Sequence, residues 1–215
     1  MADHVTQMAD GSQMPLISLL RLEAEKRGLL SRDARVDAGG VFALIRDMPY
    51  QRASSREPEA IIREWRGTCS GKHYLLDALF REMGHDSRVV MCTHNFTPEN
   101  TAHFPEPLRS EVSQGLVPDV HTYVRLHTEA GWMKVDATWP QSARALGMAV
   151  NDRFIPGVDM DVACSPIEVF DVPDGVDPQT FKEELIEVHC GSDMDRRDRF
   201  IEAMSRWLAQ TTVPG

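Results

Sequence analysis

One segment, residues 69–83, constrains the fold of this chain more than any other. Its apolar side chains recur at helical spacing and predict a helix with one buried face. They are Leu75, Leu76, Leu79, Phe80 and Met83. Gly84 is suited to end the helix, and the apolar run 87–93 that follows predicts a buried strand. The chain therefore places a buried helix directly before a buried strand.

The rest of the sequence predicts helices and strands in separate blocks. Shorter helices are expected before this segment, at residues 15–30, 41–48 and 57–65, where proline and glycine mark their ends. Strands are expected at 120–128 and 131–138, which form a hairpin, and at 153–155 and 167–172. Two more helices are expected at 178–188 and 193–210. Segregation of this kind predicts an α+β fold.

The chain is expected to form one domain. Residues 1–13 are polar and predict a flexible N-terminus, whereas 14–210 show no linker or internal repeat and predict a single domain. Its core is expected at about 57–140. Residues 97–118 hold four prolines and little periodicity, so they predict a long loop, of the kind that is usually functional or disordered.

Composition excludes several classes of protein. With 215 residues and a net charge of −10, the chain is not expected to bind nucleic acid. No apolar run is long enough to span a bilayer, and the first residues lack the basic and apolar parts of a secretory signal. The four cysteines show no C-x-x-C spacing. We therefore expect a cytoplasmic protein with reduced thiols and no membrane association.

Three residues carry the candidate chemistry. Cys69 begins the buried helix, where free N–H groups and the helix dipole stabilise a thiolate and an oxyanion. Gly67, just before it, is expected to allow a sharp turn and the close approach of a substrate. His121 opens a strand after the proline-rich stretch and is a candidate base. Asp136 is expected on the neighbouring strand of the hairpin, facing His121, where it would orient the imidazole.

The same residues lie in a longer pattern. Gly67-Thr68-Cys69 begins a helix that ends near Gly84 and leads into Ser87-Arg88-Val89-Val90. His121-Thr122-Tyr123-Val124 and Gly131-Trp132 through Asp136-Ala137-Thr138-Trp139 follow. Over residues 60 to 140 this pattern resembles the transglutaminase-like superfamily. The resemblance implies a papain-like core, with the nucleophile helix packed on an antiparallel sheet. It also implies Cys69 as the nucleophile, His121 as the base and Asp136 as the residue that orients it. The helices predicted before Cys69 and after Pro178 have no counterpart in the pattern and are expected to be extra N- and C-terminal helices.

Other residues have weaker claims to a site. His73 lies one helical turn after Cys69, and Trp65 and Trp139 flank the pattern, so these three are candidate substrate contacts or packing residues. Cys92, Cys164 and Cys190 are expected to be structural. A zinc site made by Cys92, His94 and His103, or by Cys69 and His73, is an alternative, but it lacks the usual ligand spacing. No calcium-binding loop is present in the sequence, and we expect neither a metal nor another cofactor.

Two functional hypotheses follow. In the first, the chain is a cysteine-dependent enzyme, an amide or ester hydrolase or an amine acyltransferase, with a Cys69–His121–Asp136 triad. Its partner would be a peptide or a small-molecule acyl substrate, and the resemblance does not decide which. In the second, it is a non-catalytic binding or scaffold domain of the same fold, which uses its acidic surface and residues 97–118 for recognition.

Overall fold

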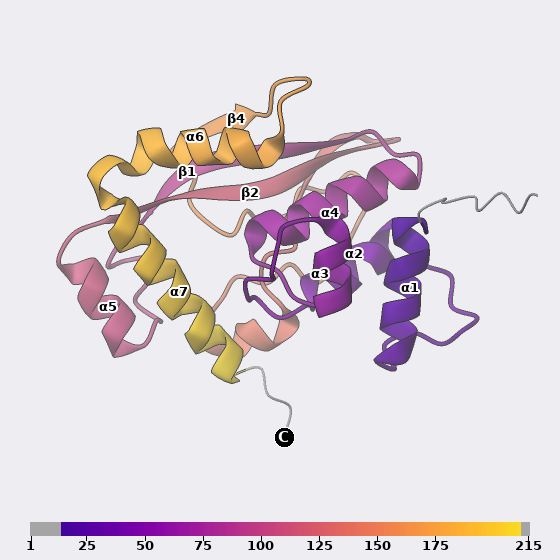
Figure 1. The fold of residues 1–215 in the computed structure, drawn as a ribbon, viewed down its shortest axis with the longest axis horizontal. Helices are drawn as coiled ribbons and strands as arrows, with labels where there is room; N and C mark the ends of the chain where they lie inside the picture. The colour runs from indigo at the N-terminus through magenta and orange to yellow at the C-terminus, as the bar shows by residue number, and fades with distance from the viewer. Residues whose placement is uncertain (1–13, 212–215) are drawn as a thin grey trace, which may run out of the picture.

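The computed structural model describes residues 14–211, so the predicted flexible N-terminus lies outside the described residues. The described part is α+β, as predicted, with helices and strands in separate blocks (Figure 1). Its helices are α1 (Leu16–Lys26), α2 (Ala38–Arg46), α3 (Pro58–Glu64), α4 (Cys69–Glu82), α5 (Glu106–Ser113), α6 (Pro178–Cys190) and α7 (Met194–Thr211). Its strands are β1 (Ser87–Phe96), β2 (Val117–Thr128), β3 (Gly131–Val135) and β4 (Glu168–Asp171).

The strands form an antiparallel sheet in the order β3-β2-β1-β4. β2 and β3 form the predicted hairpin, but β3 pairs only with residues 124–128 of β2. Residues 117–123 of β2 therefore have no partner strand on that side, although β1 continues to pair with them on the other. This one-sided stretch contains His121.

Helix α4 is the central helix of the fold, and its bounds agree with the sequence prediction. Its apolar stripe packs with Val124, Leu126 and the buried residues of α1, α2 and α3 in the largest apolar cluster. Gly71 lets α3 approach closely, because a Cβ there would lie 2.6 Å from the Ile61 side chain. The start of α4, and with it Cys69, is thus held by tight packing on both sides.

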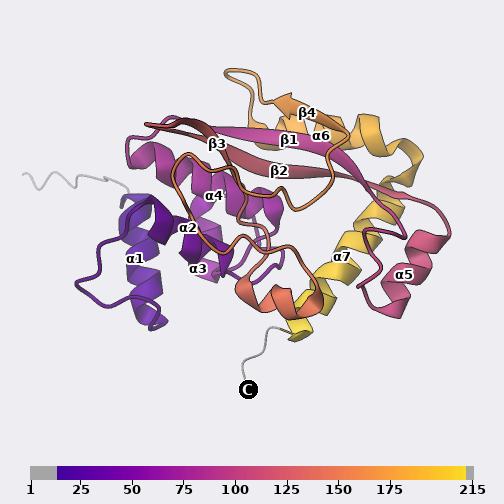
Figure 2. The ribbon, with the colours of Figure 1, turned by 180° about the vertical axis from the view of Figure 1, so that it is seen from behind.

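Alternate residues of the central strands face different neighbours, as expected for a sheet covered unequally on its two faces. Val89, Met91 and Val120 pack with apolar side chains of α6 and with Tyr74 of α4. Val90, Cys92 and Tyr123 instead contact Val162 and Cys164 from the long connection between β3 and β4. Figure 2 shows this connection running down to the 3₁₀ helix Gln141–Leu146 and back past α2 and α4 to β4.

Three details of the predicted elements are wrong. Residues 97–118 are not one long loop, because they contain α5 and the first residues of β2. Two of the four prolines that suggested a loop, Pro105 and Pro107, stand at the start of α5, where proline fits a helix, and Leu108 and Val112 bury its inner face. Residues 153–155 form no strand, and the strand predicted at 131–138 ends at Val135.

None of the helices within residues 14–211 is both long enough and apolar enough to cross a membrane.

Candidate active site

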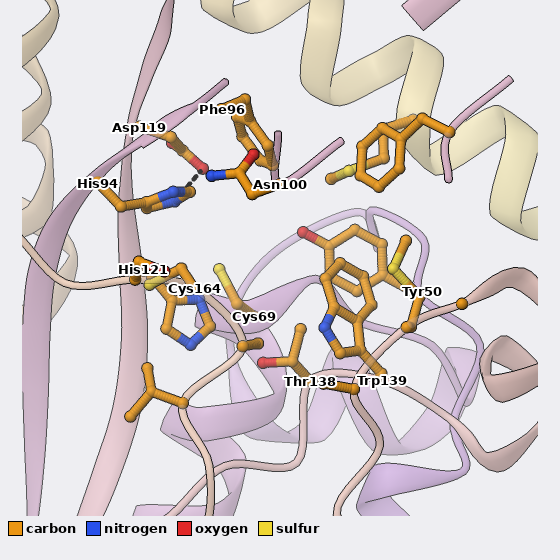
Figure 3. A pocket seen from close by; sticks show the side chains of 18 of the residues that line it. Tyr50, Cys69, His94, Phe96, Asn100, Asp119, His121, Thr138, Trp139 and Cys164 are labelled. Atoms are coloured by element: carbon orange, nitrogen blue, oxygen red, sulfur yellow. Dashed lines mark ion pairs between the residues drawn. The ribbon is translucent and has the colours of Figure 1, made fainter. Parts of the chain in front are cut away.

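Cys69 is the first residue of α4, as the sequence predicted. The preceding residue, Thr68, makes no side-chain hydrogen bond to the helix end, so N–H groups there stay available. Cys69 is 7% exposed, and that exposure faces a cavity of about 270 Å³ (Figure 3). The thiol is therefore shielded from bulk water but open to a small molecule in the cavity.

His121 and Asp136 lie together beside this thiol. The His121 Nε2 donates a hydrogen bond to Asp136 Oδ2 at 2.8 Å, and both side chains are buried. This leaves Nδ1 of His121 for Cys69, and the interaction of the imidazole with the thiol lowers the pKa of Cys69 and raises that of His121. Cys69, His121 and Asp136 thus form a continuous chain of side chains in the order that nucleophilic catalysis needs.

Asp136 reaches His121 in a way that the sequence did not predict. It does not face His121 across the hairpin, because β3 ends one residue earlier and its last pair is Val124 with Val135. The carboxylate is instead fixed by backbone N–H groups: Thr138 donates to Oδ1 and Ala163 to Oδ2, each at 2.9 Å. The Asp136 carbonyl in turn accepts a hydrogen bond from Asn151. The connection between β3 and β4 thus holds the carboxylate in place.

The charges of the triad support one another. Burial alone would raise the pKa of the Cys69 thiol, but Lys182 and His121 outweigh it and lower that pKa to about 6. Burial would lower the pKa of His121, yet Asp136 and the Cys69 thiolate hold it well above its usual value. The pKa of Asp136 lies below its usual range, because the His121 cation outweighs the effect of burial. Near neutral pH the site therefore favours a thiolate and an imidazolium.

Lys182 is a residue of the site that sequence reasoning missed. Its Nζ lies 3.5 Å from Cys69 Sγ and is 2.8 Å from Ser70 Oγ and 3.1 Å from Thr122 Oγ1. It comes from α6, more than a hundred residues after Cys69, and it is only 4% exposed. A lone lysine in an amphipathic helix carries no signal in the sequence that would distinguish it from a surface lysine.

His73, predicted as a possible substrate contact, is fully buried and does not line the cavity. Its Nδ1–H donates to the Cys69 carbonyl at 2.7 Å, and its Nε2 accepts from the Ala137 N–H at 2.9 Å. Both nitrogens are used by the neutral ring, and burial lowers the pKa of His73 to about 4. His73 thus ties the start of α4 to the segment that carries Asp136.

Lys72 has a related structural role. It is fully buried, and its Nζ donates to the carbonyls of Arg46, Ala137 and Thr138 at 2.9, 3.4 and 3.0 Å. Burial lowers the pKa of Lys72 to about 7. Its contacts join the end of α2 to the residues just after Asp136.

The cavity beside Cys69 is mainly aromatic and apolar. Trp139, a predicted substrate contact, is in its wall, and its ring packs against Tyr50 with centroids 4.8 Å apart. The Tyr50 hydroxyl is turned toward Cys69 (Figure 3), and the two residues interact electrostatically. Thr138 Oγ1, also in the wall, is the one buried side-chain oxygen or nitrogen of residues 14–211 without a hydrogen-bond partner.

One side of the cavity carries the carboxylate of Asp119. Asp119 is in the wall and forms an ion pair with Arg197 of α7 at 2.6 Å, and His94 Nε2 lies 3.6 Å from its other oxygen. Burial would raise the pKa of Asp119, but the Arg197 guanidinium outweighs it and keeps that pKa far below its usual range. A fixed carboxylate therefore lies within the cavity, opposite the aromatic rings of Tyr50 and Trp139 (Figure 3).

Trp65 and Gly67 have roles other than those the sequence suggested. Trp65 does not line the cavity; it ends α3 in a left-handed conformation (φ 54°) and packs under the Arg27 guanidinium. A Cβ on Gly67 would press on Lys72, at 3.2 Å from its Cγ. Gly67 therefore allows the chain to pack on its own helix, rather than leaving room for a substrate.

The remaining cysteines are free thiols. Cys92 and Cys164 lie with their sulfurs 3.6 Å apart, and Cys164 lines the cavity, whereas Cys190 donates to the Pro118 carbonyl. Within the described part of the chain, no group of three or more His, Cys, Asp or Glu side chains is arranged to hold a metal ion. The alternative zinc sets weighed from the sequence are therefore not assembled there.

Comparison with known proteins identifies one family. Residues 41–137 match the family model described as the transglutaminase-like superfamily, so the resemblance seen in the sequence is confirmed. The match begins earlier than expected, at α2, and includes Cys69, His121 and Asp136. A search of curated proteins and a search of solved structures each gave no match.

Proposed function

We propose that this chain, which carries a transglutaminase-like core at residues 41–137, is a cysteine-dependent acyl-transfer enzyme. The observation that carries the proposal is the His121 imidazole, which is hydrogen-bonded to Asp136 and lies beside the Cys69 thiol at the wall of a cavity (Figure 3). Its chemistry is hydrolysis of an amide or ester, or transfer of the acyl group to an amine.

In the first half of the proposed reaction, the Cys69 thiolate attacks the carbonyl carbon of the substrate, and the carbonyl electrons move to oxygen. When this intermediate collapses, the bond to the leaving amine or alcohol breaks. The His121 imidazolium gives the leaving group its proton, and a thioester on Cys69 remains.

In the second half, water or an amine attacks the thioester carbon. The now neutral His121 takes a proton from this nucleophile, and the Cys69 thiolate leaves with the electrons of the carbon–sulfur bond. Asp136 keeps the imidazole in the tautomer with its proton on Nε2, so that Nδ1 can accept and return the second proton. The site is thereby returned to its starting state.

The oxyanion of both intermediates needs donors beside Cys69. The backbone N–H of Cys69 and the hydroxyl of Tyr50 are at that position, and the burial of Tyr50 strongly raises its pKa, which keeps it protonated as a donor. The sequence predicted only the backbone groups. Tyr50 lies between α2 and α3, outside the helix that Cys69 begins.

The size of the cavity supports a small acyl group rather than a long peptide segment. About 270 Å³ is at the lower end of the range for small-molecule sites, and the walls are largely aromatic. Asp119, the unpaired Thr138 hydroxyl and Asn100 are among the polar groups of the wall that could orient such a substrate. The expected cytoplasmic location and the absence of nucleic-acid and membrane partners stay predictions.

The second hypothesis, a non-catalytic scaffold, gives no reason for a thiol with a pKa near 6 on the wall of a cavity. A scaffold needs only the packing of α4 on the sheet, which a serine or alanine at position 69 would equally allow. Burial raises the pKa of Cys190 to about 11, as expected for a structural thiol, and the lowered pKa of Cys92 is caused first by its contact with the Cys164 thiol, not by a cation beside a cavity.

The proposal is tested by turnover of a panel of small esters, primary amides and secondary amides, with water alone and with added methylamine. We expect release of the leaving group by the native protein and none by Cys69→Ala, with Cys190→Ala as the matched control that retains activity. Capture by methylamine identifies a transferase, and its absence a hydrolase. If Cys69→Ala turns over every reactive substrate as fast as the native protein, the proposal is wrong.

A further inference from the structure

Lys182 carries a positive charge into the interior without a carboxylate beside it. The described residues offer its Nζ no carboxylate at ion-pair distance; its partners are the hydroxyls of Ser70 and Thr122 and the sulfur of Cys69. A buried charge is costly unless an opposite charge compensates it. Of these three partners, only Cys69 becomes an anion near neutral pH.

Lys72 shows how the same fold holds a buried lysine whose direct partners are carbonyl oxygens. Its Nζ is surrounded by three carbonyl oxygens, and burial lowers its pKa to about 7. Lys182 has fewer and weaker oxygen partners than Lys72, two hydroxyls in place of three carbonyls. A purely structural role like that of Lys72 therefore explains the position of Lys182 poorly. An ion pair with the Cys69 thiolate explains it better.

Lys182 contacts the sulfur from the side away from the substrate. Its side chain is not part of the cavity wall, and it reaches Cys69 past Thr122. Neighbouring residues of a strand point to opposite faces, so His121 and Thr122 of β2 lie on different sides of the strand. The sulfur is thus contacted by His121 from one side and by Lys182 from the other.

We propose that Lys182 is a catalytic counter-ion that stabilises negative charge on the Cys69 sulfur, both in the resting thiolate and when the sulfur leaves the thioester, whatever the protonation state of His121. Its role in turnover rests on the proposed acyl-transfer function, whereas its effect on the thiol does not.

The counter-ion matters most when His121 has given its proton away. After the leaving group departs, His121 is neutral and no longer attracts an anion at Cys69. When water or an amine then attacks the thioester, the sulfur must leave with the bonding electrons. Lys182 stabilises this negative charge without giving up a proton, so His121 is free to take the proton of the attacking group.

Other charged and titratable groups also face Cys69, and their effects must be separated from that of Lys182. They are His121 and Asp119 of β2, Cys92 of β1, Lys72 and Tyr74 of α4, Tyr50 before α3, and Arg197 of α7 through its pair with Asp119. Of the attractive contributions at the sulfur, the Coulomb effect of Lys182 is the largest. A substitution of Lys182 alone therefore isolates the proposed effect.

The experiment measures the pH dependence of Cys69 alkylation by iodoacetamide, which needs no substrate. Peptide-resolved mass spectrometry separates Cys69 from Cys164, which also lines the cavity. We expect the native rate to rise through pH 6 and to level off above it, since only the thiolate reacts. In Lys182→Met the midpoint should rise by about one to three pH units, as expected for loss of an adjacent cation.

Two further variants separate charge from packing. Lys182→Arg keeps the charge and should hold the midpoint below that of Lys182→Met, whereas Thr122→Val removes a neutral contact of Lys182 and should leave the midpoint at the native value. Far-ultraviolet circular dichroism checks that each variant is folded, and Lys182→Gln replaces Lys182→Met if the latter is not.

The outcomes are distinct. An unchanged midpoint in a folded Lys182→Met or Lys182→Gln variant overturns the proposal, and so does a native midpoint at about 8.5, the value of an ordinary thiol. A native midpoint near 6 with no turnover of any acyl donor would leave the counter-ion in place and contradict the proposed function instead.

Discussion

Residues 41–137 and residues 138–211 contribute to the same site in different ways. The first segment, which matches the superfamily, supplies the proposed reacting groups Cys69, His121 and Asp136. The second supplies the Lys182 ammonium beside the sulfur, the Ala163 N–H that fixes Asp136, and the Arg197 cation that pairs with Asp119. The first segment thus carries the proposed nucleophile, base and orienting carboxylate. The second adds the cations and the backbone N–H that act on these groups.

This difference suggests which part of the chain decides the substrate. The wall of the cavity is shared, but Met148, Val162, Cys164 and Met204 come from the second segment. Substitutions in the first segment should therefore abolish chemistry, whereas substitutions in the second should alter stability, thiol acidity and the choice of acyl group. Three substitutions test this division, from the largest expected effect to the smallest.

Asp136→Asn should cause the largest loss. The amide cannot stabilise the His121 imidazolium as a carboxylate does, and its NH₂ group can turn toward His121 or toward the Thr138 and Ala163 N–H groups. A loss of turnover of about 10²- to 10⁴-fold is expected, as for the aspartate of other triads. kcat/KM on the best acyl donor measures it. Asp86→Asn, at an exposed carboxylate, is the matched control.

If Asp136→Asn kept native turnover, His121 would need no orienting carboxylate. Residues 41–137 would then not supply a complete catalytic triad.

Arg197→Met tests the second segment through stability. Arg197 and Asp119 are both largely buried, and removal of the guanidinium leaves the Asp119 carboxylate uncompensated. We expect the free energy of unfolding to fall by about 3–5 kcal/mol. Urea unfolding measures this, with Arg199→Met as the exposed control. Addition of Asp119→Asn to Arg197→Met should recover part of the loss, and a double variant no more stable than the single one would contradict the ion-pair explanation.

His73→Gln tests the link between α4 and the Asp136 segment through its pH dependence. Above pH 6.5 His73 is neutral in the folded and unfolded chains and adds no pH dependence. Between pH 6.5 and 4 the unfolded chain takes up a proton that the buried ring refuses, so stability falls with falling pH. The fall should total about 3 kcal/mol at pH 4 and below.

In His73→Gln this part of the acid-induced fall in the free energy of unfolding should disappear. The control variant His127→Gln, at an exposed histidine, should show the same fall as the native protein. The measurement is the free energy of unfolding of each variant at pH 7 and pH 4. Parallel pH profiles for His73→Gln and the native protein would mean that the ring is protonated in the fold, and that its two hydrogen bonds are not as described.

The sequence was most informative where one element decides the outcome. The apolar stripe of α4, the position of Cys69 at its start and the β2–β3 hairpin all follow from local spacing, and the structure has them as predicted. Local reasoning failed where local signals conflict. Proline is common both in loops and at helix starts, so the prolines of residues 97–118 predict a loop where the structure has α5.

Long-range contacts could not be predicted at all. Lys182 meets Cys69 across 113 positions of sequence, and nothing near Lys182 indicates that its side chain turns inward. The same holds for Tyr50, which reaches the site because α2 and α3 pack beside α4. For His73 the sequence leaves packing and substrate contact open, since helical spacing gives its face but not the partners that occupy both of its nitrogens.

The central claim is that Cys69 becomes acylated during the reaction. The direct measurement mixes the native protein with a small activated ester such as p-nitrophenyl acetate, stops the reaction with acid within the first turnover, and maps the acyl group by mass spectrometry. The account predicts one acyl group per chain, on the peptide that contains Cys69, and none on Cys69→Ala. An acyl group that stays equally abundant in Cys69→Ala, or that maps to Lys182 or Cys164 instead, would contradict it.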